Sequence, residues 1–284
     1  MELRKIILSL AISGFITTVS AQIPLFKVPI PENTLKEMSE RNSRIIISSK
    51  NNKTEIFPYE YADCDSLTEV VVEEGIEKIG DYAFLGCKNI TSIKLPLSLK
   101  EIGEGAFRDC TALVYLKIPE GVKTLPPYMC AWDENLREVV LPSSVEDIGR
   151  NAFAYCINLS SIDLPEGLKH IGPNAFSFCK SIEEVSVPDS MEELESYVFS
   201  GCENLRKAKL PCNDRMLGEL IFTGCLNLKE IVSPSPNPPS FDCNSPLMDL
   251  SEEEIWQNVT LIIPEQSKKR YQESPGWSFF FKTD

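Results

Sequence analysis

Residues 92–110 read SIKLPLSLKEIGEGAFRDC, and the chain rewrites this pattern every 23 residues. Three columns of residues keep this spacing, apart from one altered copy. The phenylalanine column contains Phe84, Phe107, Phe153, Phe176, Phe199 and Phe222. The cysteine column contains Cys64, Cys87, Cys110, Cys156, Cys179, Cys202 and Cys225. The proline column contains Pro96, Pro119, Pro142, Pro165, Pro188, Pro211 and Pro234. A period of this length predicts a solenoid, in which each repeat forms one coil that packs on the next.

Each repeat predicts a short strand followed by turns. In ITSIKLP at 90–96 and LSSIDLP at 159–165, apolar and polar residues alternate, so every second side chain should face the core. Proline ends each strand because it has no N–H to donate. We expect the strands to pair in parallel as one long sheet, and Ala-Phe, as at 106–107, to plug the convex side in a helical or 3₁₀ turn. The predicted fold class is an α/β solenoid with right-handed coils, capped at both ends.

The sequence predicts four parts in one domain. Residues 1–21 have the pattern of a signal peptide, with a basic start, an apolar stretch too short to span a bilayer, and Val-Ser-Ala before the expected cleavage point. Residues 22–43 are the expected N-terminal cap, residues 44–234 the repeats, with about eight coils and a degenerate first one, and residues 235–284 the C-terminal cap. We therefore expect an exported monomer that is secreted, periplasmic or held at the cell surface.

Three places depart from the repeat pattern. In the degenerate first coil, Ile47 is expected to align with Val70 one period later. In the altered copy, Cys130 stands in the phenylalanine column and Asp133 in the cysteine column. In the last copy, Asp214 stands where an aliphatic residue belongs, so this coil is expected to be displaced or loose.

Charge and cysteine spacing limit the classes of partner. The chain has 42 Asp and Glu against 28 Lys and Arg, a net charge of −14, which repels nucleic acid and anionic membranes. Seven of the ten cysteines share one column, where parallel side chains about 4.8 Å apart do not meet disulfide geometry. We expect these thiols to form a reduced, buried ladder of small apolar side chains. The sequence leaves open a bridge between Cys212 and Cys243.

The repeat unit resembles the BspA-like class of bacterial leucine-rich repeats. Its pattern, Cys-x-x-Leu-x-x-Ile-x-Leu-Pro-x-x-Leu-x-x-Ile-Gly-x-x-Ala-Phe, is nearly intact at 87–103 and 156–175. The resemblance extends over residues 44–234, and the tail at 271–281 is similar to the ends of such proteins. It implies a secreted or surface protein, in a family of which some members adhere to host proteins. It does not identify a ligand.

The sequence gives little support to an enzyme. His170 is the single histidine and lies in a row of charged and polar residues, so neither a catalytic triad nor a multi-histidine zinc site can be assembled. Composition alone leaves a paired-carboxylate glycosidase open, but the faces of a solenoid are open rather than cleft-like. We expect no catalytic residue, no cofactor and no metal.

Two surfaces are candidates for partner binding. On the outer face of the sheet, Lys94, Tyr115 and Lys117 should cluster on adjacent strands as an aromatic residue with two cations on an acidic protein. The alternative interpretation is an ordinary solvated sheet face.

The second candidate is the position just before the cysteine column. Trp132, Tyr155 and Phe178 occupy it in three successive coils and should stack with ring centres about 5 Å apart, and Tyr128 extends the group. The stripe predicts a platform for a sugar ring or an apolar partner side chain. The alternative interpretation is mutual packing that shields the convex edge.

The predicted function is therefore non-covalent binding by an exported protein. The leading hypothesis is adhesion to, or recognition of, a host or cell-surface protein through a solenoid face, such as a protein of the extracellular matrix. The alternatives are a glycan-binding accessory protein and a structural component of a bacterial surface assembly.

Overall fold

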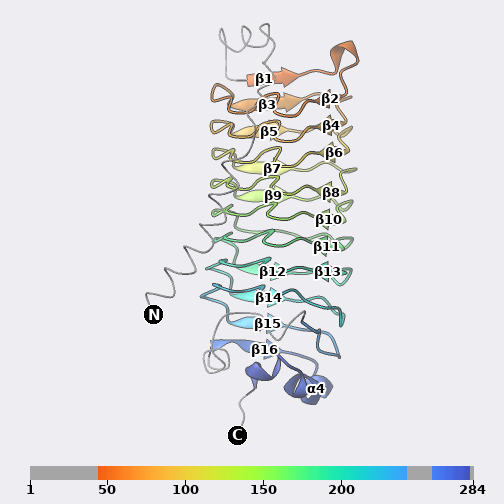
Figure 1. Cartoon of the computed structure of the whole chain (residues 1–284), viewed down its shortest axis with the longest axis vertical. Helices are drawn as coiled ribbons and strands as arrows, with labels where there is room; N and C mark the ends of the chain where they lie inside the picture. The colour runs from red at the N-terminus through yellow and green to blue at the C-terminus, as the bar shows by residue number, and fades with distance from the viewer. Residues whose placement is uncertain (1–43, 242–257, 282–284) are drawn as a thin grey trace.

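The computed structural model describes residues 44–241 and 258–281. The described chain forms a single column of coils, stacked from β1 near one end to α4 near the other (Figure 1). Parallel strands lie across the column in two rows, and within each sheet every strand pairs with a strand of a neighbouring coil. The repeat period therefore becomes the spacing of a β-solenoid, as the columns predict.

The first row contains the strands that end at or near the proline column. It forms two parallel sheets, with the strand orders β1-β3-β5-β7-β9 and β12-β14-β15-β16. The strands are β1 (Arg44–Ile47), β3 (Glu69–Val72), β5 (Ser92–Lys94), β7 (Tyr115–Lys117), β9 (Glu138–Val140), β12 (Glu184–Ser186), β14 (Lys207–Lys209), β15 (Glu230–Val232) and β16 (Thr260–Ile262). The row is interrupted between β9 and β12, where only an isolated bridge joins Glu138 to Ser161. The prediction of one continuous sheet is wrong at this coil, although Ile162 keeps its buried position.

The second row consists of two-residue strands that follow the turn after each proline. Its sheets are β2-β4-β6 and β8-β10-β11-β13. The strands are β2 (Glu55–Ile56), β4 (Lys78–Ile79), β6 (Glu101–Ile102), β8 (Thr124–Leu125), β10 (Asp147–Ile148), β11 (His170–Ile171) and β13 (Glu193–Leu194). In each of them the second residue is buried and the first faces outward. The second apolar pair of each repeat therefore contributes a ladder of its own.

The Ala-Phe segments lie beyond this second row and consist of successive turns. The helical or 3₁₀ turns expected there are not confirmed, because the helices of the described chain lie elsewhere: η1 (Lys50–Asn52), η2 (Glu265–Ser267), α4 (Lys268–Glu273) and η3 (Ser278–Phe280). The phenylalanine rings are fully buried and stack from coil to coil, for example Phe153 on Phe176 with ring centroids 5.3 Å apart. These rings and the inward strand residues form one continuous core.

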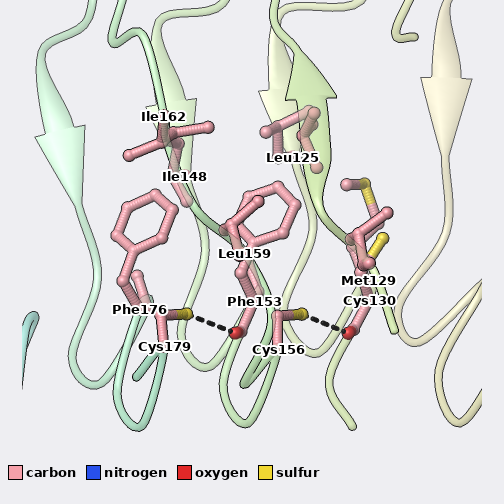
Figure 2. Close-up of a cluster of buried hydrophobic side chains, with 14 of the residues drawn as sticks. Leu125, Met129, Cys130, Ile148, Phe153, Cys156, Leu159, Ile162, Phe176 and Cys179 are labelled. Atoms are coloured by element: carbon pink, nitrogen blue, oxygen red, sulfur yellow. Dashed lines mark hydrogen bonds between the residues drawn. The ribbon is translucent and has the colours of Figure 1, made fainter. Parts of the chain in front are cut away.

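The cysteine column has a hydrogen-bonding role that the sequence did not predict. From Cys87 onward, each thiol of the column donates to the main-chain carbonyl of a residue 26 positions earlier, so Cys156 donates to Cys130 over 3.1 Å and Cys179 to Phe153 over 3.1 Å (Figure 2). Burial raises the pKa of the Cys202 thiol to about 12, so it stays protonated as a donor. Cysteine suits this column because it is small enough for the core and still satisfies a buried carbonyl.

In the altered copy, the large and the small side chain exchange places at two adjacent core positions, so that the total side-chain volume stays similar. Cys130 is fully buried but supplies no ring, so the phenylalanine stack is broken at this coil. Met129, also fully buried, replaces the alanine that precedes phenylalanine in the neighbouring coils, and Figure 2 shows its side chain beside Cys130. A Met-Cys pair thus stands where the neighbouring coils have Ala-Phe.

The first coil has a different register from the expected one. Ile47 pairs with Val72, and Ile45 takes the place opposite Val70. The second row keeps the repeat spacing, with Ile56 opposite Ile79. The two additional residues therefore lie between β1 and β2, in the segment that forms η1.

The end of the repeats follows the expected displacement. Asp214 is exposed, and its coil continues the second row only through isolated bridges of Leu217 to Leu194 and Phe241. Beyond it, β16 pairs in parallel with β15. Tyr271 and Trp277 are fully buried in the same core, and the Trp277 Nε1–H donates to the Pro239 carbonyl over 2.7 Å. The N-terminal segment 1–43 lies outside the described residues.

Candidate functional site

The turn segments of successive coils form one face of the column, which we call the turn face. Its eight-residue segments run from 57–64, 80–87, 103–110, 126–133 and 149–156 to 172–179, 195–202 and 218–225. Two positions in each segment have positive φ: the third, as in Tyr128 (58°), and the seventh, as in Trp132 (67°). Glycine adopts this conformation without steric cost, whereas a bulky residue pays about 1–2 kcal/mol.

Three aromatic residues occupy the seventh position in the middle of the turn face. Trp132, Tyr155 and Phe178 have φ values of 67°, 63° and 59°. Other coils have glycine there, such as Gly86 and Gly201, so the fold itself does not require an aromatic residue at this position. Strained positions of this kind cluster at functional sites, which makes the three residues candidates for a binding role.

The rings stack along the column, as the sequence predicts. The ring centroids of Trp132 and Tyr155 are 5.6 Å apart with an interplanar angle of 5°. Those of Tyr155 and Phe178 are 4.6 Å apart with an angle of 13°. All three side chains are half-buried, so part of each ring reaches solvent. Burial raises the pKa of the Tyr155 hydroxyl.

Both outer faces of this stack are covered. On the side of the preceding coil, the Arg108 guanidinium lies over the Trp132 ring, with Cζ 4.5 Å from the centroid. On the side of the following coil, Phe178 lies against the backbone of Gly201, where a Cβ atom would come within 2.7 Å of Phe178 Cδ1. The exposed parts of the stack are therefore ring edges, not ring faces.

Tyr128 joins the stripe through two arginines. The Arg108 Cζ lies 5.6 Å from the Tyr128 centroid and the Arg150 Cζ lies 5.2 Å from it, both within the range of a cation–π contact. We call the following group the arginine–aromatic patch: Arg108, Tyr128, Trp132, Arg150, Tyr155 and Phe178. The sequence reasoning missed both arginines because they belong to different columns of the repeat, and only the register of the turns brings them beside Tyr128.

A buried carboxyl group lies directly under the patch. Asp133 is completely buried, and its Oδ1 accepts a hydrogen bond from the Cys110 N–H over 2.8 Å. Its Oδ2 has no hydrogen-bond partner among the described residues. Burial raises the pKa of Asp133 well above its usual range. The carboxyl group therefore favours its neutral form.

The second predicted cluster lies on a different part of the coil. Lys94 and Lys117 are exposed on β5 and β7, and Tyr115 is 44% exposed and pairs with Ser92. Neither lysine makes an ion pair within the described ranges. This cluster is formed by strands, whereas the arginine–aromatic patch is formed by turns, so the structure does not unite the seven predicted residues in one site.

The remaining candidate groups are the single histidine, possible metal ligands and Cys212. His170 is half-buried at the surface with its Nδ1 2.6 Å from Asp147 Oδ1, one coil away. Among residues 44–241 and 258–281, no group of three or more His, Cys, Asp or Glu side chains is placed to hold a metal ion. The same ranges contain no helix long and apolar enough to cross a membrane. Cys212 is exposed, and Cys243, to which the sequence leaves a bridge open, lies outside the described residues.

Comparison with known proteins identifies the repeat. The sequence matches the family described as "BspA type Leucine rich repeat region" in six copies, over residues 54–132 and 123–238. A search of the curated proteins finds no match.

Several solved structures are similar to this chain. A leucine-rich cell surface protein from Faecalibacterium prausnitzii is 25% identical, with a TM-score of 0.46; the alignment covers 68% of this chain and 60% of that one. The leucine-rich repeat protein of T. pallidum is 27% identical over 66% of this chain and 78% of its own, with a TM-score of 0.47. A leucine-rich repeat protein from Bacteroides ovatus is 24% identical over 78% and 71%, with a TM-score of 0.45. The chain thus spans less than two thirds of the Faecalibacterium protein.

Proposed function

Because the chain belongs to the BspA-type leucine-rich repeat family, we propose that it is a non-enzymatic binding protein that recognises another protein through its turn face. The observation that carries this proposal is the edge-on aromatic stripe. Trp132, Tyr155 and Phe178 keep a costly backbone conformation in consecutive coils where glycine suffices elsewhere. Tryptophan, tyrosine and arginine are also the residues most enriched at the energetic centres of protein interfaces.

The covered ring faces favour a protein over a sugar as the partner. A sugar ring binds an aromatic platform by lying flat on a ring face. Here Tyr155 lies between two other rings, Trp132 lies between Arg108 and Tyr155, and Phe178 lies between Tyr155 and Gly201. Ring edges instead suit apolar and aromatic side chains, which pack edge-to-face. A sugar ring could therefore bind a ring face only if the stack opened, which would break the contacts between the stacked rings.

The proposed setting is outside the bacterial cell. The pattern of residues 1–21 predicts export, and a relative in the comparison is described as a cell surface protein. An acidic solenoid without a predicted catalytic site suits adhesion to, or recognition of, a host or neighbouring-cell protein. A structural role in a surface assembly is the third possibility, and it predicts one stable partner in envelope extracts rather than a soluble ligand.

The proposal is tested by binding purified protein to paired arrays of extracellular-matrix proteins and glycans. The decisive variant carries Trp132→Gly, Tyr155→Gly and Phe178→Gly, because glycine suits the positive φ and stands at this position in other coils. The matched control carries Lys94→Ala, Tyr115→Ala and Lys117→Ala on the sheet.

The arrays separate the three functions. A protein signal that the glycine variant loses and the sheet variant keeps supports the proposal. A protein signal that only the sheet variant loses moves the site to β5 and β7. A glycan signal that the glycine variant loses supports the sugar platform instead. If neither array gives a binding signal and a stable partner is recovered from envelope extracts, the structural role is supported.

A further inference from the structure

We propose that the arginine–aromatic patch recognises an acidic segment of the partner protein, in which carboxylates alternate with apolar side chains. This inference rests on the proposed function, because it assumes that the turn face is the binding surface, and it adds the chemistry of the partner. Three observations carry it: the two guanidinium groups make no ion pair, the turn segments of Arg150 and of the aromatic stripe contain no exposed acid, and the exposed parts of the stripe are ring edges.

The two arginines are cations without carboxylate partners. Several cations elsewhere on the column pair with acids one coil away, as in Lys100–Glu77 at 2.9 Å, Lys169–Glu146 at 2.6 Å and Lys180–Glu203 at 2.8 Å. Arg108 and Arg150 make no ion pair in the part of the chain that the structure describes. Their planar groups lie instead over Tyr128 and Trp132, which orders the guanidinium and leaves N–H donors for a carboxylate.

Three of the four turn segments that form the patch lack exposed acids. Turn segments 149–156 and 172–179 contain no Asp or Glu, and the single acid of 126–133 is the buried Asp133. Every other turn segment contains a surface acid, as the following residues show: Asp63, Asp81, Glu104, Asp109, Glu195 and Glu219. Glu104 and Asp109 share their segment with Arg108, and Asp109 pairs with Lys88 over 3.7 Å. In a chain with a net charge of −14, segments 126–133, 149–156 and 172–179 therefore form a local region with the cation Arg150 and no exposed acid. It attracts an acidic segment and disfavours a basic one, since like charges in contact cost several kcal/mol.

The size of the patch suits a short extended peptide. It extends from the coil of Arg108 to the coil of Phe178, which is three coil spacings or about 14 Å. An extended chain covers this distance with about four to five residues. Carboxylates at the arginine end and apolar side chains at the stripe would satisfy both parts of the patch together.

The experiment uses three labelled twelve-residue peptides and the full-length protein. In one peptide Glu alternates with Leu and Tyr, and in the two matched peptides every Glu is replaced by Gln or by Lys. Fluorescence anisotropy measures binding in low and moderate salt. The variants are Arg108→Gln, Arg150→Gln and, as the control, Arg137→Gln, which removes one exposed positive charge outside the patch. Circular dichroism checks that each variant is folded.

We expect the Glu peptide to bind more tightly than the other two and to lose affinity as salt rises. Arg108→Gln and Arg150→Gln should each weaken it about tenfold, as expected for loss of a charge-assisted hydrogen bond, and Arg137→Gln less than twofold. The affinity of Arg108→Lys for the Glu peptide should lie between those of the wild type and Arg108→Gln, because lysine keeps the charge but lacks the planar guanidinium group.

Two results would overturn the inference and leave the proposed function standing. One is equal or tighter binding of the Gln or Lys peptide that the triple glycine variant abolishes. The other is Glu-peptide binding that Arg108→Gln and Arg137→Gln weaken equally. If none of the peptides binds, the acidic-segment inference is wrong, and the protein array alone decides whether the turn face is the binding surface.

Discussion

Single residues of the turn face show where the fold and the surface have different requirements. The backbone requires positive φ at two positions per segment, which glycine fills in Gly86, Gly201 and Gly224. Tyr155 fills one of them with a bulky ring and gains a stack with Trp132 in return. The stability of the site is therefore a balance between backbone strain and ring packing.

This balance predicts an unusual order of stability for two variants of Tyr155. Tyr155→Ala loses the stacking contacts and keeps the backbone penalty, whereas Tyr155→Gly loses the same contacts and removes the penalty. We expect the glycine variant to be more stable than the alanine variant by about 1 kcal/mol, measured by urea unfolding. Ala154→Gly is the control, since Ala154 does not have positive φ and should be destabilised by about 0.5–1 kcal/mol. An alanine variant as stable as the glycine variant would contradict the strain argument.

Asp133 predicts a pH dependence of stability. Burial raises its pKa in the folded state, so the group contributes fully to stability below the pKa of the unfolded chain, about 4. This contribution falls as pH rises from there toward the folded pKa, because the unfolded chain ionises first. In Asp133→Asn, the amide oxygen can still accept from the Cys110 N–H without any charge. We expect the stability of this variant relative to the wild type to increase between pH 4 and pH 8.

Urea unfolding at several pH values measures this difference. Asp147→Asn is the control, because Asp147 is half-buried at the surface beside His170 rather than enclosed in the core. Asp133→Cys tests the same point with a second substitution, because a thiol at this position would restore the hydrogen-bond donor that cysteine supplies in other coils. A difference between Asp133→Asn and the wild type that stays constant with pH would mean that the carboxyl group does not change its charge on unfolding.

At the scale of the element, the unit of packing is the ring and the small residue before it. Phe176 stacks between Phe153 and Phe199, with centroids 5.3 Å and 5.5 Å away, and is fully buried. Phe176→Ala should therefore cost about 3–5 kcal/mol in urea unfolding, because it leaves a cavity against both neighbouring coils. A cost below about 1 kcal/mol would show that this position is not a core position at all.

The altered coil supplies a matched comparison for this substitution. If Met129 compensates for the missing ring at Cys130, the same Met-Cys pair should fill the core in another coil. The double variant Ala175→Met with Phe176→Cys should then be more stable than Phe176→Cys alone. If the methionine gives no recovery, the natural Met-Cys coil must be held by its own surroundings, among them Asp133.

The 23-residue period predicted the contacts between residues of the same column. It did not predict contacts between residues of different columns. The core columns, the strand faces and the ring stack follow from spacing, because a period of 23 residues fixes which side chains meet. The contacts of Arg108 with Trp132 and Tyr128 combine three different columns, which only the path of the turns places together. The thiol ladder was predicted, but its hydrogen bonds were missed for a similar reason, since their acceptors are main-chain carbonyls of other columns.

Register was the least predictable feature because it depends on loop length. The first coil has two additional residues between β1 and β2, so β1 pairs with β3 two residues away from the repeat spacing. Because side chains alternate between the two faces of a strand, a shift of two residues keeps Ile45 and Ile47 on the core side. The missing strand at Ser161 likewise has no signal in the sequence, since Ile162 and Leu164 keep the apolar pattern.

For the whole molecule, stability should depend on register more than on length. Each coil contacts mainly its two neighbours, and strand pairs throughout the central repeats keep one spacing, as in Tyr115 with Glu138 and Glu184 with Lys207. Deleting residues 149–171 removes one whole repeat and joins Ile148 to Gly172. Every remaining column then keeps its face, Trp132 comes beside Phe178, and β9 comes beside β12 without the interrupted coil between them.

We expect this shortened protein to fold cooperatively, with a urea m-value lower by roughly a tenth because it exposes less surface on unfolding. The control deletes one residue more, 149–172, which moves each following side chain to the opposite face of its strand. That variant should be poorly folded or aggregated in circular dichroism and size-exclusion chromatography. If both deletions fold equally well, the turns absorb register errors and the coils are less strictly coupled than their strand pairing suggests. If both fail, the interrupted coil around Ser161 is itself required, and the column is not a simple sum of repeats.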